Sequence, residues 1–192
     1  MAYARGGVAP APPNIVFILT DDQRWDTINK KHSVDGRTPV MRRVTRLLVD
    51  KGVLFRNSFV TTALCCPSRS SIFSGKYAHT TGVHTNGGPD GGAHVFDDSS
   101  TLPVWLHAVG YRTGIFGKYL NGYAALAPYQ APGWDEWHVF RSPGYFNYHL
   151  IENGVDVVYG SAATDYSTDV LRDEVVRFIA QSTPPFFVEF TP

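Results

Sequence analysis

The sequence predicts an α/β fold in which helices flank a central, mostly parallel sheet. Strand-like apolar runs alternate with stretches of helical periodicity along the 192 residues. The first run, residues 14–20, is continuous and β-branched, which is typical of a buried parallel strand. The last run, residues 186–190, is followed by only two residues, so we expect 14–192 to be the N-terminal part of a larger domain, truncated at its C-terminus.

The elements between these two runs follow from their punctuation by proline and glycine. Helices are expected at 38–52, 67–75, 101–109 and 165–180, and further strands at 53–60 and 111–117. A hairpin of 145–151 and 155–159 is expected around Asn153-Gly154. The Gly-, Pro- and aromatic-rich stretch 121–144 is expected to be an ordered loop, and the Pro-rich residues 1–13 a flexible segment.

Composition excludes several classes of function. The 17 basic and 17 acidic residues balance, and no long run of one sign indicates a nucleic-acid groove or a charged membrane-binding patch. No apolar run is long enough to span a membrane, and residues 1–13 lack the apolar middle region of a secretory signal. The only cysteines, Cys65 and Cys66, are adjacent and form no disulfide framework.

The densest chemical signal is the run Cys65-Cys66-Pro67-Ser68-Arg69. With Cys66 as the cap and Pro67 at the first helical position, Cys65 is expected just outside a helix N-terminus, where free N–H groups and the helix dipole favour an anion. Arg69 lies in the first turn, so its guanidinium can reach back toward that anion. The alternative interpretation is a buried cysteine pair beside a capped helix.

Two further positions follow strands. Asp21 and Asp22 come at the carboxyl end of the first strand, where α/β sheets bind ligands, and paired carboxylates offer hard oxygen ligands for Ca²⁺ or Mg²⁺. Taken alone, such a pair is more often a turn or a helix cap. Lys118 follows the strand at 111–117, and taken alone it is an ordinary solvated charge.

These segments resemble the sulfatase family. Its signature C-x-P-S-R with a glycine six residues later is matched by Cys65, Pro67, Ser68, Arg69 and Gly75. The run from Gly110 to Lys118 is similar to the second family signature, G-Y-x-T followed by G-K. The resemblance extends from about residue 14 to the end of the chain and implies the alkaline-phosphatase-like fold and hydrolysis of sulfate esters.

The resemblance also implies roles for individual residues. Cys65 becomes 3-oxoalanine (formylglycine) through a formylglycine-generating enzyme, and Cys66 is a spectator. One hydroxyl of the hydrated aldehyde attacks sulfur, and the other loses its proton to expel sulfate and restore the aldehyde. Asp21, Asp22 and residue 65 bind Ca²⁺, with Mg²⁺ as the alternative, and Lys118 contacts the sulfate. The sequence itself does not determine the compartment, and the resemblance implies a secreted, periplasmic or lysosome-like location.

The chain departs from a common family pattern at Leu120, where many sulfatases carry a histidine. The run Gly-Lys-Tyr-Leu-Asn at 117–121 resembles instead the branch of N-acetylglucosamine-6-sulfatases and heparan 6-O-endosulfatases. Asn86 and His79 are candidates for binding a sulfated small molecule or glycan, although a solvated loop histidine is an equally good interpretation of His79.

Two other functions remain open at this stage. Relatives with the same nucleophile cleave phosphonates or phosphodiesters, and a truncated fragment can keep the fold without the activity. The family's remaining site residues lie farther along the sequence than residue 192. Since Ca²⁺ prefers six to eight oxygen ligands, we expect this chain alone to bind metal weakly and to turn over slowly or not at all.

Overall fold

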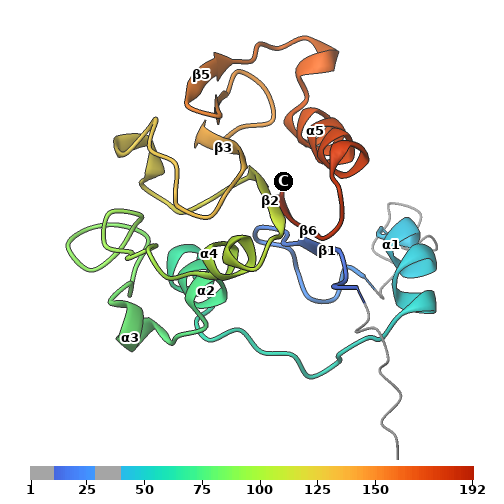
Figure 1. Cartoon of the computed structure of the whole chain (residues 1–192), viewed down its shortest axis with the longest axis horizontal. Helices are drawn as coiled ribbons and strands as arrows, with labels where there is room; N and C mark the ends of the chain where they lie inside the picture. Colours follow the sequence, from blue (N-terminus) through green and yellow to red (C-terminus); the bar gives the residue numbers. More distant parts are fainter. Residues whose placement is uncertain (1–10, 29–39) are drawn as a thin grey trace, which may run out of the picture. The chain divides into compact units, whose positions relative to one another are not determined.

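The computed structural model describes residues 11–28 and 40–192, and the chain forms two units. The first unit comprises the chain up to Leu19 together with residues 61–192, and it contains a six-stranded sheet of order β1-β6-β2-β3-β4-β5 (Figure 1). The strands are β1 (Ile15–Ile18), β2 (Arg112–Gly117), β3 (Glu136–Ser142), β4 (His149–Glu152), β5 (Val155–Val158) and β6 (Phe186–Thr191). β1, β6, β2 and β3 are parallel, which confirms the mostly parallel α/β sheet.

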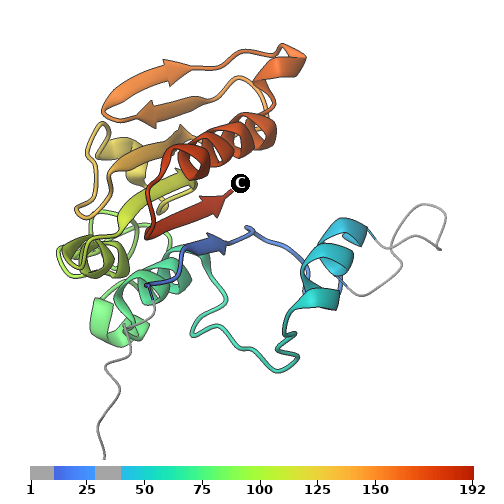
Figure 2. The same ribbon diagram turned by 45° about the vertical axis from the view of Figure 1, so that its right-hand side comes forward.

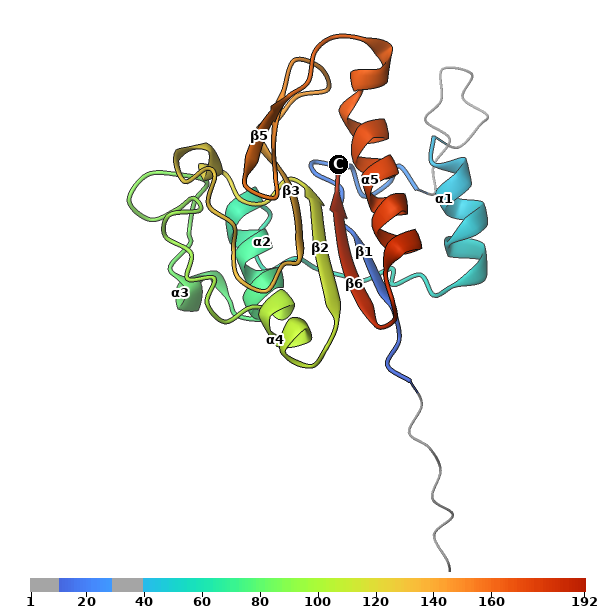
Figure 3. The ribbon, with the colours of Figure 1, turned by 45° about the horizontal axis from the view of Figure 1, so that its top comes forward.

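Helices flank this sheet on both faces. Their bounds in the first unit are α2 (Cys65–Ser74), α3 (Ala78–Thr81), α4 (Leu102–Ala108) and α5 (Ser167–Gln181), with short 3₁₀ turns η2 (Tyr123–Ala125) and η3 (Ala163–Asp165). α5 lies on one face, and α2 and α4 lie on the other (Figure 3). The predicted helices at 67–75, 101–109 and 165–180 are therefore confirmed, with ends that differ by a few residues.

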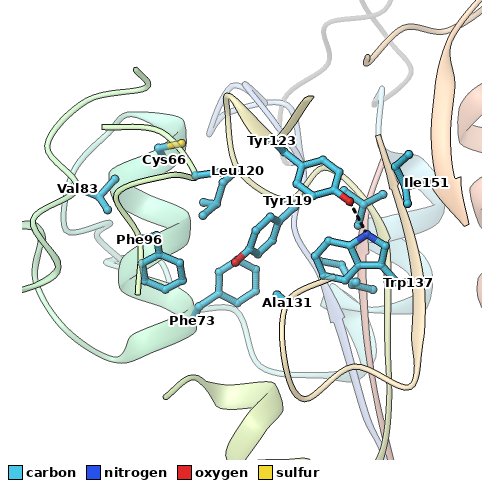
Figure 4. Close-up of a cluster of buried hydrophobic side chains, with 13 residues drawn as sticks. Cys66, Phe73, Val83, Phe96, Tyr119, Leu120, Tyr123, Ala131, Trp137 and Ile151 are labelled. Carbon is cyan, nitrogen blue, oxygen red and sulfur yellow. Dashed lines mark hydrogen bonds between the residues drawn. The ribbon is translucent and has the colours of Figure 1, made fainter. Parts of the chain in front are cut away.

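Each face of the sheet has its own hydrophobic core. The core beside α2 is built around Phe73, Tyr123 and Trp137, and the indole N–H of Trp137 donates a 3.0 Å hydrogen bond to the hydroxyl of Tyr123 (Figure 4). The core beneath α5 includes Phe116 and Phe178, whose rings meet edge to face. Because both faces are covered, the central strands carry mainly apolar side chains on both sides.

The hairpin prediction is confirmed. β4 and β5 pair antiparallel, and Asn153 and Gly154 form the connection with positive φ angles of 47° and 89° (Figure 2). Positive φ at both positions is the requirement of a type I′ turn, which asparagine and glycine satisfy best. β4 in turn pairs with β3, so the hairpin extends the parallel part of the sheet.

Three sequence predictions need correction. The stretch 121–144 is not only loop, because residues 136–142 form β3, with Trp137 and Val139 buried in the core. Residues 53–60 form no strand, and Phe59 is 89% exposed. β1 is parallel as predicted but lies at the sheet edge, so Val16 and Ile18 are 49% and 52% exposed.

The second unit, residues 20–60, contains α1 (Arg42–Leu47) and the 3₁₀ turn η1 (Val49–Lys51). The hydroxyl of Thr45 donates a 3.0 Å hydrogen bond to the carbonyl of Ile28 and so joins α1 to the segment after β1. The predicted cap of this helix at residues 38–39 lies outside the described residues, as does most of the expected flexible segment. Across 11–28 and 40–192, every helix is too short or too polar to cross a membrane.

Candidate functional site

The N-terminus of α2 begins earlier than the sequence predicts. Leu64 is the N-cap residue and its carbonyl accepts a hydrogen bond from the N–H of Ser68 at 3.0 Å. Cys65 is therefore the first helical residue, half-buried, and Pro67 occupies the third position, where its missing N–H is equally harmless. The helix ends at Gly75, whose φ of 67° is left-handed. Residue 65 thus lies where the helix dipole favours an anion.

Arg69 joins this helix to the end of β2. Its side chain is buried, and its Nη1 donates a 2.6 Å hydrogen bond to the carbonyl of Lys118. The hydroxyl of Thr191, at the end of β6, donates to the same carbonyl at 2.7 Å. The Lys118 N–H in turn donates to the Thr191 carbonyl at 2.9 Å. The peptide of Lys118 is therefore fixed to the helix that carries residue 65, at the carboxyl edge of the sheet.

A buried carboxyl group lies on the same strand as Thr191. Glu189 is fully buried in the middle of β6, and its Oε1 has no hydrogen-bond partner among the described residues. Burial raises its pKa to about 8, although the positive charge of Arg69 acts in the opposite direction. This group was missed by the sequence analysis, and the available signal was one acid inside the apolar run 186–190.

Three residues meet at the second position of α2. The N–H of Cys66 donates to Oδ1 of Asn86 at 2.9 Å, which satisfies one of the free donors of the helix N-terminus. The Cys66 thiol accepts the N–H of Asn121 at 3.0 Å and lies 3.5 Å from Oδ1 of the same residue. Burial raises the pKa of the Cys66 thiol, which favours the protonated form. The Oδ1 of Asn86 is thus used by the helix itself.

The two predicted metal-binding acids follow β1. The N–H of Leu19 still pairs with the carbonyl of Phe190 at 2.9 Å, and Asp21 and Asp22 come directly afterwards, in the second unit. The chemistry of the donors decides which ion they fit. Carboxylate oxygens are hard ligands that suit Ca²⁺ or Mg²⁺, and an oxygen at residue 65 would match them, whereas the sulfur of an unmodified Cys65 suits softer metals.

Two other positions singled out by the sequence lie in different surroundings. His79 lies in α3, past the opposite end of α2, where its exposed ring stacks on Tyr77 with centroids 5.7 Å apart. Leu120 is 3% exposed and packs in the core beside α2, as Figure 4 shows. The side chain that stands at the position of the common histidine therefore points into the core.

Comparison with known proteins places this geometry in a family. The chain is 37% identical over 184 residues to an extracellular sulfatase SULF-1 homolog of Drosophila melanogaster, with 88% of this chain and 15% of that protein covered. It is 34% identical over 190 residues to human N-acetylglucosamine-6-sulfatase, with 92% and 33% covered. The chain thus spans a third or less of these relatives.

Solved structures show the same fold. One, in complex with its substrate D-glucosamine-2-N,6-O-disulfate, has a TM-score of 0.70 and 26% identity, covering 93% of this chain and 34% of that one. The phosphonate monoester hydrolase of Agrobacterium radiobacter has a TM-score of 0.63 at 19% identity, covering 94% and 40%. The fold is therefore alkaline-phosphatase-like. The family model described as Sulfatase matches residues 13–190, and the chain belongs to the sulfatase family.

Proposed function

We propose that this chain provides the nucleophile-bearing part of an enzyme that hydrolyses sulfate esters on a sulfated sugar, with residue 65 as formylglycine. The observation that carries the proposal is the hydrogen bond from buried Arg69 to the carbonyl of Lys118. This hydrogen bond connects the helix that begins at residue 65 to the end of β2, where Lys118 lies. The bond fixes the Arg69 guanidinium and the backbone of Lys118, and a guanidinium and an ammonium group are both suited to the charge that develops on sulfate oxygens.

Each residue has a separate task in this proposal. The aldehyde hydrate at residue 65, when formed, supplies the hydroxyl nucleophile. Arg69 and Lys118 bind and orient the sulfate, and the N-terminus of α2 adds its partial positive charge. Asp21, Asp22 and residue 65 are the proposed ligands of a divalent ion, Ca²⁺ before Mg²⁺, which when bound polarises the sulfate oxygens. A formylglycine-generating enzyme is the proposed maturation partner.

The substrate class rests on the relatives. Human N-acetylglucosamine-6-sulfatase matches 92% of this chain, and one structural neighbour binds a disulfated glucosamine as its substrate. A sulfated glycan bearing a 6-O-sulfated glucosamine is therefore the substrate that we propose. In this proposal Asn86 binds the sugar through its Nδ2 group, because its Oδ1 already accepts the Cys66 N–H. The exposed position of His79 leaves its proposed substrate contact to be tested by mutation.

Peptide mass spectrometry across position 65 tests the nucleophile directly. Protein made together with the maturation enzyme is expected to lose roughly 18 Da at residue 65, and Cys65→Ser made in parallel is expected to show no such loss. An unmodified thiol in protein made with a competent maturation enzyme would contradict the proposed nucleophile.

Paired assays on an aryl sulfate and an aryl phosphonate test the reaction class. We expect faster turnover of the sulfate, and a preference for the phosphonate would favour the alternative hydrolase. The 192 residues alone are expected to turn over slowly, because three protein ligands are fewer than the six to eight oxygens that Ca²⁺ prefers. Comparison with human N-acetylglucosamine-6-sulfatase, of which this chain covers 33%, tests that expectation, and equal rates would contradict it.

A further inference from the structure

Asn121, in the loop that follows β2, contacts the N-terminal turn of α2. Asn121 donates its backbone N–H to the Cys66 sulfur at 3.0 Å, and its Oδ1 and carbonyl oxygen lie 3.5 Å and 3.7 Å from that sulfur. The carbonyl also accepts the N–H of Ala93 at 2.8 Å, so the loop is held from two sides. A thiol group can accept one hydrogen bond and donate another at the same time.

A second loop reaches the same residue from its backbone side. Asn86 accepts the Cys66 N–H at 2.9 Å, and it lies 20 residues further along the chain. The second residue of α2 is therefore held through both its main chain and its side chain. Cys65 is joined to Cys66 by one planar peptide bond, so holding Cys66 in place restricts the side chain of Cys65 to a few dihedral angles.

We propose that Cys66, Asn86 and Asn121, together the Cys66 cluster, are positioning residues that orient the side chain at position 65. The cluster holds the first turn of α2 against two loops and so fixes the direction in which residue 65 faces the anion-binding N-terminus. Such fixing matters because a misplacement of about 1 Å at a reacting group lowers a rate by about a hundredfold. The proposal makes Cys66 more than a spectator beside the nucleophile.

The test uses the unmodified chain and needs no turnover. Cys65 is alkylated with anionic iodoacetate and with neutral iodoacetamide, and peptide mass spectrometry assigns each adduct to its cysteine. The rate with iodoacetate divided by the rate with iodoacetamide reports the positive electrostatic potential at the sulfur of residue 65. Cys66→Ala is expected to lower this ratio about two- to fivefold, the range that corresponds to a charge at a helix N-terminus.

The conservative variant and a matched control separate positioning from general stability. Cys66→Ser keeps a hydrogen-bond donor and acceptor at this position and is expected to keep the ratio close to the wild-type value. Ser70→Ala removes a fully buried hydroxyl from the same helix, one whose Oγ has no hydrogen-bond partner among the described residues, and it is expected to leave the ratio unchanged. Asn86→Ala leaves the buried thiol in place and is also expected to lower the ratio. It therefore tests the proposal even if Cys66→Ala does not fold.

A ratio that stays at the wild-type value in folded Cys66→Ala and Asn86→Ala would overturn the proposal. So would an equal drop in Ser70→Ala, since that would indicate a loosened helix rather than a lost contact. Because the measurement needs neither the aldehyde nor a sulfate ester, it succeeds or fails independently of the proposed hydrolase activity.

Discussion

Glu189→Gln is expected to make the stability of the folded chain less dependent on pH. The carboxyl group is fully buried, and its pKa is raised from 4.5 to about 8 by burial. Below pH 4.5 the group is protonated in both the folded and the unfolded chain, so its ionisation contributes nothing there. Between pH 4.5 and 8 only the unfolded chain ionises, and stability falls as pH rises. The amide of glutamine does not titrate in this pH range, so it adds no such pH dependence.

The size of the effect follows from the same values. At about 1.4 kcal/mol per pH unit, the free energy of unfolding of the wild type falls by at most about 5 kcal/mol across this window. Local relaxation that lets water reach the carboxylate reduces this value, so we expect the advantage of Glu189→Gln over wild type to grow by at least about 2 kcal/mol between pH 5 and 8.5. Above pH 8 the difference is expected to level off.

Urea denaturation followed by tryptophan fluorescence measures this difference at each pH. Trp137 is fully buried in the first unit and reports its unfolding. Asp173→Asn is the matched control, because it removes one acid whose side chain is 69% exposed. A Glu189→Gln difference that stays constant from pH 5 to 8.5 would show that Glu189 is ionised in the folded chain and that Arg69 offsets its burial.

Three further predictions concern other parts of the structure. Thr191→Val removes one of two side-chain donors to the carbonyl that follows β2 and is expected to destabilise the fold by about 1 kcal/mol in the same denaturation assay. Phe178→Ala opens a cavity beneath α5 and is expected to cost about 3–5 kcal/mol, whereas Val176→Ala on the exposed side of that helix is expected to cost less than about 0.5 kcal/mol; equal losses would contradict the core assignment. Asp21→Asn and Asp22→Asn are each expected to weaken Ca²⁺ binding to the matured protein at least tenfold by calorimetry, and unchanged affinity would exclude them as ligands.

Local pattern was sufficient where an element carries its own signals. α2 and α4 begin near a proline and end at or near a glycine, and the Asn-Gly turn specifies its hairpin, so these elements were predicted from the sequence. β3 was missed because its neighbours are rich in glycine, proline and aromatic residues. Its strand character comes from pairing with β2 on one side and β4 on the other.

The sequence by itself determined the α/β class, the family resemblance and the residues proposed for the chemistry, since each of these is carried by a short run of neighbouring residues. Only the tertiary structure showed that Arg69 binds the peptide of Lys118, 49 residues away, and that Cys66 meets Asn121 at a separation of 55. It also showed that Glu189 is buried. Contacts of this kind depend on which strands and loops become neighbours when the sheet assembles. The local periodicity of the sequence does not specify the order of strands in the sheet.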